Sequence, residues 1–533
     1  MLQTIETLIF LLLIIAAVSA VAQRLKVPPA ILLVVTGVAL GLTPGLPAVA
    51  LAPELVLLLV LPPVIYASAV AMSWREFRTD LWSISFLSIG CVVFTTVTAA
   101  AAAHLLLGLP WPVGFVLGAI VSPPDSVAPL AILRRLRLPH RITVILEGEG
   151  LANDATALIL YRFAVVAVSV GSFSLSHAVG TFMLIVVGEI LWGIAVGWMM
   201  LHLRRWVDGP RTEILLSVLT PFIAYWPPEY FGGSGVLATM VTGLYFSWNG
   251  IRLISAATRL QGIFFWDFLI YVIEGLVFLI TGLQTRTLLA DMRGYSVHDL
   301  LVSAAIISAA IILARFVCVF PIVYFRRLLF DLLLHRKAAE RWRGSFLIAF
   351  TGIRGIVSLA AALAIPLVTA NGEAFPDRDL ILFLTFSVIL VTLVGQGLLL
   401  PLLIRLLGLA HAGRRELSAD RSEERRARHQ AIETVLSHLE QLAAERCLPE
   451  EVVEPLRVRH RDRLRHLDDH DGDDCQRQRV ALSDELEGLL IEAERNLINE
   501  LYRNGNLKDE ARRKIERELD LRHAQLANHH QED

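Results

Sequence analysis

Charged residues are scarce in the first 410 residues of this 533-residue chain. That stretch carries 26 Lys/Arg and 21 Asp/Glu, whereas the 123 residues from His411 onward carry 22 and 29. A soluble domain is about 25% charged and about 45–50% apolar, but this chain is 18% charged and 55% hydrophobic, with a mean hydropathy of +0.60. A hydrophobic segment of 410 residues followed by a highly charged tail excludes a soluble globular enzyme, a disordered chain and a nucleic-acid binder.

Cysteine and lysine are also rare. The four cysteines show no CxxC spacing, so neither a disulfide framework nor a metal site is indicated. Four lysines are present and none follows a glycine, which excludes a Walker A loop, because that loop holds nucleotide phosphates with a Gly-Lys pair. Transport by this chain would therefore use an ion gradient. No basic segment precedes the first apolar run, whose first charge is Glu6, so we expect a membrane span there rather than a cleaved signal.

Apolar runs follow one another along residues 1–410, and roughly 17–25 apolar residues cross a bilayer as a helix. Breaks at polar residues, proline and glycine divide them into thirteen candidates, at 5–22, 28–43, 54–69, 82–107, 112–134, 141–170, 176–204, 212–226, 232–248, 260–284, 297–327, 343–370 and 379–409. The sequence therefore predicts an all-α polytopic membrane protein with about thirteen transmembrane helices in a domain over 1–410.

Basic residues are distributed unequally between the two sets of loops that join these runs. One set holds 19 Lys/Arg, and the other holds three, Arg286, Arg293 and Arg378. Because short basic loops stay in the cytoplasm, we expect the N-terminus outside and the C-terminal tail inside. The tail, 411–533, shows helical periodicity with charges that suit solvated helix faces. We expect a mainly helical cytoplasmic domain there, and leave open whether it binds a regulatory ligand.

Three ionisable residues are predicted at one level near the middle of the membrane. Asp154 and Asp125 each lie 13 residues into their spans, and Arg354 lies 11 residues into its span. At 1.5 Å per residue these depths are about 20, 20 and 17 Å. A charge in a span is costly and is a functional hypothesis by default. Glu274 and Arg315, also near mid-depth on successive spans, predict a buried ion pair, whereas Glu189 receives no role.

Two of the predicted spans cannot be regular helices throughout. Val121-Ser-Pro-Pro-Asp-Ser-Val-Ala-Pro129 contains prolines that remove amide donors and clash with the preceding turn. Thr351-Gly-Ile-Arg-Gly355 is a second weak point at matching depth, in a span that runs the opposite way. Irregular backbone at this depth is tolerated where it lines a cavity. Two broken spans of opposite direction are typical of inverted repeats, whose broken helices bind ions.

Glu147-Gly-Glu-Gly-Leu-Ala-Asn-Asp-Ala-Thr156 is the segment richest in chemistry. Glu149 and Asn153 are four residues apart and share a helix face, and we expect Arg354 to pair with Glu149 there. Asp154 is rotated away from Glu149 by about 140°. Hard oxygen ligands of this kind suit a small cation, and carboxylates also accept protons.

At these residues the chain resembles the monovalent cation:proton antiporter-1 family, the NhaP-type sodium/proton exchangers of bacteria. The matching pieces are Ser122-Pro-Pro-Asp-Ser-Val-Ala, Glu149-Gly-Leu-Ala-Asn-Asp-Ala, Glu274-Gly-Leu-Val-Phe-Leu-Ile-Thr-Gly-Leu-Gln and Gly352-Ile-Arg-Gly-Ile-Val-Ser-Leu-Ala. The resemblance extends in motif order over essentially all of 1–410. It implies two inverted repeats with two broken crossing helices, and a core that moves like an elevator against a dimerisation domain.

The resemblance also implies roles for particular residues. Asp154 would bind the transported monovalent cation and the proton in turn, and Asn153, Asp125 and Ser122 would complete that site. The resemblance places Glu149 and Arg354 in a supporting network, beside the Glu274–Arg315 pair predicted from depth. Asn153 stands where electrogenic relatives carry a second aspartate, which implies electroneutral exchange.

The same resemblance implies a multi-pass homodimer in the bacterial inner membrane, in contact with lipid and not with nucleic acid. No cofactor is expected besides the transported Na⁺ and H⁺, with Li⁺ and K⁺ as other candidate cations, and no enzymatic activity. Two positions depart from the family pattern. Gly150 replaces a serine that commonly follows the glutamate, and Pro124-Asp125-Ser126 replaces the usual residues around the aspartate, so a side-chain hydroxyl ligand is missing from the pattern.

Two other functions are compatible with the residues alone. A cation channel could use the same carboxylates as a selectivity ring, and a membrane sensor could signal through the tail. Paired broken spans and a single central carboxylate favour the carrier.

Overall fold

The computed structural model describes residues 2–43, 56–136, 138–170, 175–207, 209–250, 254–292, 295–334, 342–369, 372–469, 474–504, 507 and 509–531. The chain divides into two units, Met1–Glu416 and Leu417–Asp533. The boundary lies inside α21 (Leu409–Glu445), somewhat after the end of the domain that the hydropathy indicates, because this helix runs on without a break.

The first unit consists of helices, many of which are long and apolar. In chain order they are α1 (Leu2–Leu25), α2 (Pro29–Leu42), η1 (Val56–Val60), α4 (Leu61–Ala71), α5 (Trp74–Thr79), α6 (Leu81–Ser85), η2 (Phe86–Cys91), α7 (Val92–Leu107), α8 (Trp111–Val121), α9 (Val127–Arg135), α10 (His140–Val170), α11 (Leu175–Arg204), α12 (Pro210–Tyr230), α13 (Val236–Asn249), α14 (Ala256–Leu283), α15 (Thr285–Asp291), α16 (Val297–Leu334), α17 (Trp342–Phe350), α18 (Ile356–Leu363), α19 (Arg378–Leu390), η4 (Val391–Gln396) and α20 (Gly397–Leu406). The π-helical stretches η1, η2 and η4 each continue into an α-helix.

Each predicted apolar run coincides with a helix or with consecutive helices. Within the described residues, seven helical segments are long and apolar enough to cross a membrane, and three shorter apolar helices accompany them. The short helices α5 and α15 were not predicted, because they lie in the connections between apolar runs. The predicted break in 112–134 separates α8 from α9, and the predicted break in 343–370 separates α17 from α18.

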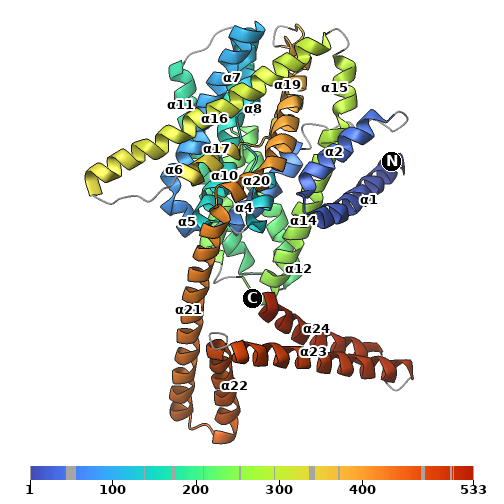
Figure 1. Cartoon of the computed structure of the whole chain (residues 1–533), viewed down its shortest axis with the longest axis vertical. Helices are drawn as coiled ribbons and strands as arrows, with labels where there is room; N and C mark the ends of the chain where they lie inside the picture. Colours follow the sequence, from blue (N-terminus) through green and yellow to red (C-terminus); the bar gives the residue numbers. More distant parts are fainter. Residues whose placement is uncertain are drawn as a thin grey trace. The chain divides into compact units, whose positions relative to one another are not determined.

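Glycines allow several helix pairs to approach closely. A Cβ added to Gly282 of α14 would lie 2.3 Å from Val34 O of α2, and one added to Gly37 of α2 would lie 2.3 Å from Leu279 O. Gly118 of α8 faces the backbone of α7 in the same way, at 2.4 Å from Thr96 O. Small residues commonly mediate helix packing in membranes. Across this bundle runs α16, which packs against α7 and α17 (Figure 1).

Glu189, to which the sequence analysis assigns no role, caps a helix. Its carboxylate lies in α11 and accepts hydrogen bonds from the backbone N–H groups of Ser234 (2.6 Å), Gly235 (3.2 Å) and Leu237 (3.2 Å). These groups form the N-terminus of α13, which has no intrahelical acceptors for them and carries partial positive charge. A buried glutamate is therefore explained by structure here.

The second unit continues α21 with three further helices, α22 (Glu450–Asp469), α23 (Asp474–Arg503) and α24 (Asp509–Gln531). Arg457 of α22 donates to Glu440 of α21 at 2.8 Å, and this bond holds the pKa of Glu440 below its usual value. α23 and α24 lie side by side (Figure 1), joined by Arg495–Asp520 at 2.7 Å over the buried Ile491 and Leu519.

Candidate functional site

The two helix breaks meet each other through the backbone. The helix is interrupted at residues 122–126, between α8 and α9, where Pro123 and Pro124 lie. A second interruption lies at residues 351–355, between α17 and α18. The Asp125 N–H donates to Ile353 O at 2.7 Å. This hydrogen bond gives a partner to a backbone N–H of one break and to a backbone C=O of the other. Membrane lipid could not supply these partners.

Arg354 ties the same two breaks together with its side chain. Its Nη1 donates to Ser122 O at 2.6 Å, and its backbone N–H donates to the Thr392 hydroxyl of η4 at 3.0 Å. The guanidinium is 1% exposed, and its Nε has no hydrogen-bond partner among the described residues. The hydroxyl of Ser122 donates to Ala119 O of its own helix. Ser122 therefore contributes its carbonyl to this junction, rather than a free hydroxyl.

Asn153 and Asp154, adjacent on α10, have different surroundings. Asn153 is fully buried, and its Nδ2 donates to Pro124 O at 2.6 Å, which fastens α10 to the α8–α9 break. Its Oδ1 is buried and has no partner among the described residues. Asp154 instead lines a cavity, and no described residue hydrogen-bonds to its carboxylate.

The cavity lies between two walls of different character. One wall is the apolar face of η1 and α4, with Val60, Leu61 and Val64, and the other is built from α10 and the two breaks. Its volume is about 60 Å³, above the roughly 10–15 Å³ that a cavity needs to hold one water, so a monatomic cation fits. Asp125 and Asp154 both line it, and each carboxylate lies in the field of the other.

Asp125 also caps a helix. Its Oδ1 accepts from the Val127 N–H at the start of α9 at 3.0 Å, while its Oδ2 is buried without a partner among the described residues. Gly355 leaves room for this carboxylate, because a Cβ at residue 355 would lie 2.1 Å from Asp125 Oδ2. The sequence correctly predicted that the levels of Asp125, Asp154 and the α17–α18 break coincide.

The pairing of the buried charges differs from the prediction. Arg315 of α16 forms a two-point ion pair with Glu149, with Nη1–Oε1 at 2.6 Å and Nη2–Oε2 at 2.8 Å, and also donates to Ile348 O. The predicted Glu149–Arg354 and Glu274–Arg315 pairs are therefore wrong. Residue counts give the depth of a side chain, but not which way it points around its helix. Glu274 is half-buried on α14.

Two residues at the site were missed in the sequence. Ser126 lines the cavity beside Asp125, and Thr392 accepts a hydrogen bond from the α17–α18 break. Ser126 was visible as part of the departure from the family pattern. Thr392 gave no signal, because threonine is ordinary in an apolar helix.

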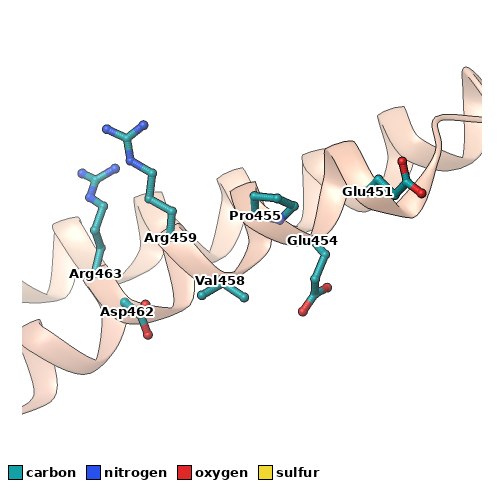
Figure 2. A pocket seen from close by; sticks show the side chains of 7 residues that line it. All are labelled: Glu451, Glu454, Pro455, Val458, Arg459, Asp462 and Arg463. Atoms are coloured by element: carbon teal, nitrogen blue, oxygen red, sulfur yellow. The ribbon is translucent and has the colours of Figure 1, made fainter.

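A second depression lies on the tail, along α22 (Figure 2). Its lining side chains all come from that one helix, and Figure 2 shows Arg459 and Arg463 pointing away from Glu454. Since the charged groups do not converge, we assign it no ligand.

Comparison with known proteins places this geometry in a family. Residues 9–406 match the family described as sodium/hydrogen exchanger, transmembrane. The chain belongs to this family. It is therefore a multi-pass membrane protein of a Na⁺/H⁺ antiporter family, as the motifs around Asp154 indicate, and its kin are transporters rather than enzymes.

Relatives of this chain include proteins from several bacteria. It is 35% identical over 443 residues to an uncharacterised Na⁺/H⁺ exchanger of Mycobacterium tuberculosis, covering 80% of this chain and 81% of that one. It is 32% identical to the sodium, potassium, lithium and rubidium/H⁺ antiporter of Bacillus pumilus, covering 74% of this chain and 60% of that one. The sodium proton antiporter MjNhaP1 of Methanocaldococcus jannaschii has a similar structure, with a TM-score of 0.61 at 19% identity over 76% of this chain and 99% of that one. This likeness shows the antiporter fold.

Proposed function

We propose that this exchanger moves one monovalent cation, Na⁺ in the first place, against one H⁺, and that Asp154 binds the two in turn. The observation that carries the proposal is the Asp154 carboxylate, which lines a small cavity at the helix breaks and to which no described residue hydrogen-bonds. A carboxylate without a protein partner is able to take either a proton or a hard cation. No resident cofactor is needed for this.

The charges around the cavity support one-for-one exchange. Glu149 and Arg315 form an ion pair, and the formal charges of Arg354 and Asp125, one on each break, cancel in the sum over this group. Asp154 is then the one uncompensated charge of this group. Since Asn153 is neutral, one Na⁺ or one H⁺ brings the site to neutrality, and each loaded form crosses the membrane without net charge.

The two walls of the cavity support alternating access by sliding. The wall on η1 and α4 is largely apolar, whereas the wall with Asp125 and Asp154 belongs to a group of helices joined by the Arg354 and Asn153 hydrogen bonds. Val56–Ala71 carries no charged side chain, so the described residues form no ion pair across this part of the seam and it can shift at low cost. The Arg162–Glu229 pair between α10 and α12 would have to break or rearrange in such a movement. We propose that the hydrogen-bonded group moves like an elevator against the other helices.

The remaining features of the proposal extend this picture. We propose thirteen spans in two inverted repeats, with the N-terminus outside and the tail in the cytoplasm, as the distribution of arginine between the loops indicates. The bacterial relatives suggest the plasma membrane, and we propose a homodimer there.

We expect the exchange rate to be bell-shaped in pH. At low pH protons occupy Asp154 and exclude the cation, and at high pH the proton needed for the return step is scarce. The optimum would then lie near the pH at which Asp154 is half protonated.

Proton flux in liposomes containing the purified protein tests this function. Gradients of Na⁺, Li⁺ and K⁺ are imposed in turn, with and without a clamped membrane potential. We expect a cation-driven proton flux whose rate does not depend on the potential. A rate that follows the potential would refute one-for-one exchange, and a current without proton flux would replace the carrier with a channel.

A further inference from the structure

Gly150 of α10 faces Ser126 across the wall of the cavity. A Cβ added to Gly150 would lie 2.3 Å from Ser126 Oγ and 2.4 Å from Ser126 Cβ, far inside van der Waals contact. The next atom it would meet, Ser126 Cα, is 3.5 Å away, which is ordinary contact. The Ser126 side chain therefore fills the space that any side chain at residue 150 would need. The two departures from the family pattern therefore meet in space, with the Ser126 side chain against Gly150.

The hydroxyl of Ser126 is not used by the protein. Two other hydroxyls near this site donate to carbonyls of their own helix, Ser122 to Ala119 O and Thr392 to Val388 O. Ser126 stands at the start of α9 without capping it, and the carbonyl four residues earlier, Ser122 O, accepts from Arg354. No described residue hydrogen-bonds to Ser126 Oγ.

Ser126 is also placed to reach an occupant of the cavity. It is half-buried and lines the cavity beside Asp125 and Asp154. Ser358 lines the same cavity, and its buried Oγ likewise has no hydrogen-bond partner among the described residues. A hydroxyl oxygen is a hard, neutral ligand of the kind that small alkali cations accept along with carboxylates.

We propose that Ser126 Oγ binds the transported cation and helps to set which cation is taken. This inference rests on the proposed function, because it assigns a further ligand to the site of Asp154. The hydroxyl comes from the α8–α9 break instead of from α10. Since a serine does not titrate in the working range, it strengthens cation binding without adding a proton site. It therefore affects affinity and selectivity, but not stoichiometry.

Ser126→Ala tests the assignment by removing only the hydroxyl. We expect the KM for Na⁺ to rise about 3- to 10-fold, the range of one hydrogen-bond-sized interaction, with the maximal rate within about two-fold and the melting temperature unchanged. The acid limb of the pH profile should move to higher pH, because a weaker-bound cation competes less well with protons for Asp154. The ratio of KM for Na⁺, Li⁺ and K⁺ should change.

A second test moves the hydroxyl from residue 126 to residue 150 on α10 and asks whether the KM for Na⁺ recovers. Gly150→Ser alone should lose folded protein or exchange, because its Cβ collides with Ser126. Ser126→Gly should raise KM as Ser126→Ala does, and Ser126→Gly/Gly150→Ser should return KM to within about two-fold of the unmodified protein. Ser169→Ala is the control, since that hydroxyl donates to Val165 O in the outer part of α10.

Two results would overturn the assignment. One is a Ser126→Ala protein whose KM values and cation ratios equal those of the unmodified protein. The other is a folded double variant with no lower KM than Ser126→Gly. If the double variant does not fold, Ser126→Ala decides alone. Absence of cation-driven proton flux in the unmodified protein would instead refute the proposed function, so the two failures are distinguishable.

Discussion

Glu149 and Arg315 are the most completely buried ion pair among the described residues, at 1% and 2% exposure. Such a pair gains little over well-packed apolar residues, but removing one partner leaves an uncompensated charge, at about 3–5 kcal/mol. The pair fixes α10 against α16, and α10 carries Asp154. The ion pair therefore stabilises the orientation of α10 and with it the position of Asp154.

The first prediction is that Glu149→Gln lowers the stability of the protein by about 3–5 kcal/mol, measured by thermal unfolding in detergent. Glu149→Gln/Arg315→Met removes both charges and should recover most of that loss. A double variant as unstable as the single one would show that the coupling between the two charges is not what stabilises α10.

The level of each charged residue along its helix was predictable from the sequence. The direction in which its side chain points around the helix was not. The helical rise alone put Asp125 and the break at Arg354 on one level, and the structure joins them through Asp125 N–H and Ile353 O. Which neighbour each charge faces depends on the rotation and tilt of helices far apart in the chain. For that reason Glu149 was assigned to Arg354 instead of Arg315.

At the scale of elements, the N-terminus of α13 depends on a carboxylate from another helix. Glu189→Ala would leave buried N–H groups of Ser234, Gly235 and Leu237 without an acceptor, each worth about 1–3 kcal/mol. We expect a clearly lower melting temperature with exchange retained below it. Glu189→Gln, which keeps an acceptor oxygen without the charge, should lose less. Equal melting temperatures for Glu189→Ala and the unmodified protein would contradict the capping role.

The crossing of α2 and α14 gives a second test at this scale. Gly282→Ala puts a methyl group 2.3 Å from Val34 O and should destabilise the protein by about 1–3 kcal/mol, the usual cost of overpacking. Gly262→Ala, on the same helix with nothing within 4 Å, is the matched control. The measurement is the difference in melting temperature between the two variants. A protein that tolerates both equally would show that α2 and α14 are not in close contact.

The sequence predicts where the α8–α9 break lies, but it predicts the glycine contacts between helices only in part. Pro123 and Pro124 predict the α8–α9 break, because a proline has no backbone N–H to donate within a helix. The spacing of Gly37 and Gly41 is the small-residue pattern of a closely packed helix, but it does not name α14 as the partner. That choice is made by packing across the whole bundle.

At the scale of the whole molecule, the two units have different compositions and separate interiors. The apolar runs predicted the helices of the first unit well, because lipid exposure forces long apolar segments. Where α16 ends, at Leu334, was not predicted, since the charged residues after 325 read as a loop. In the second unit, exposed ion pairs such as Arg457–Glu440 link neighbouring helices beside a few buried apolar side chains.

A protein that ends at Glu416 tests the division. Because Asp125, Asp154 and both breaks lie in the first unit, we expect cation-driven proton flux to persist, with a changed pH response if the tail regulates. Flux is compared with that of the full chain in liposomes at equal amounts of folded protein. Complete loss of flux from well-folded truncated protein would place part of the transport machinery in the tail.

In the proposed mechanism Asp154 binds both ions in turn. Asp154→Asn keeps the volume of the side chain but cannot alternate between a proton and a cation. The direct measurement is proton flux driven by a Na⁺ gradient in liposomes that contain the folded variant or the unmodified protein. We expect flux from the unmodified protein and none above the empty-liposome level from Asp154→Asn. Appreciable Na⁺-driven flux from the variant would show that Asp154 does not bind the transported ions.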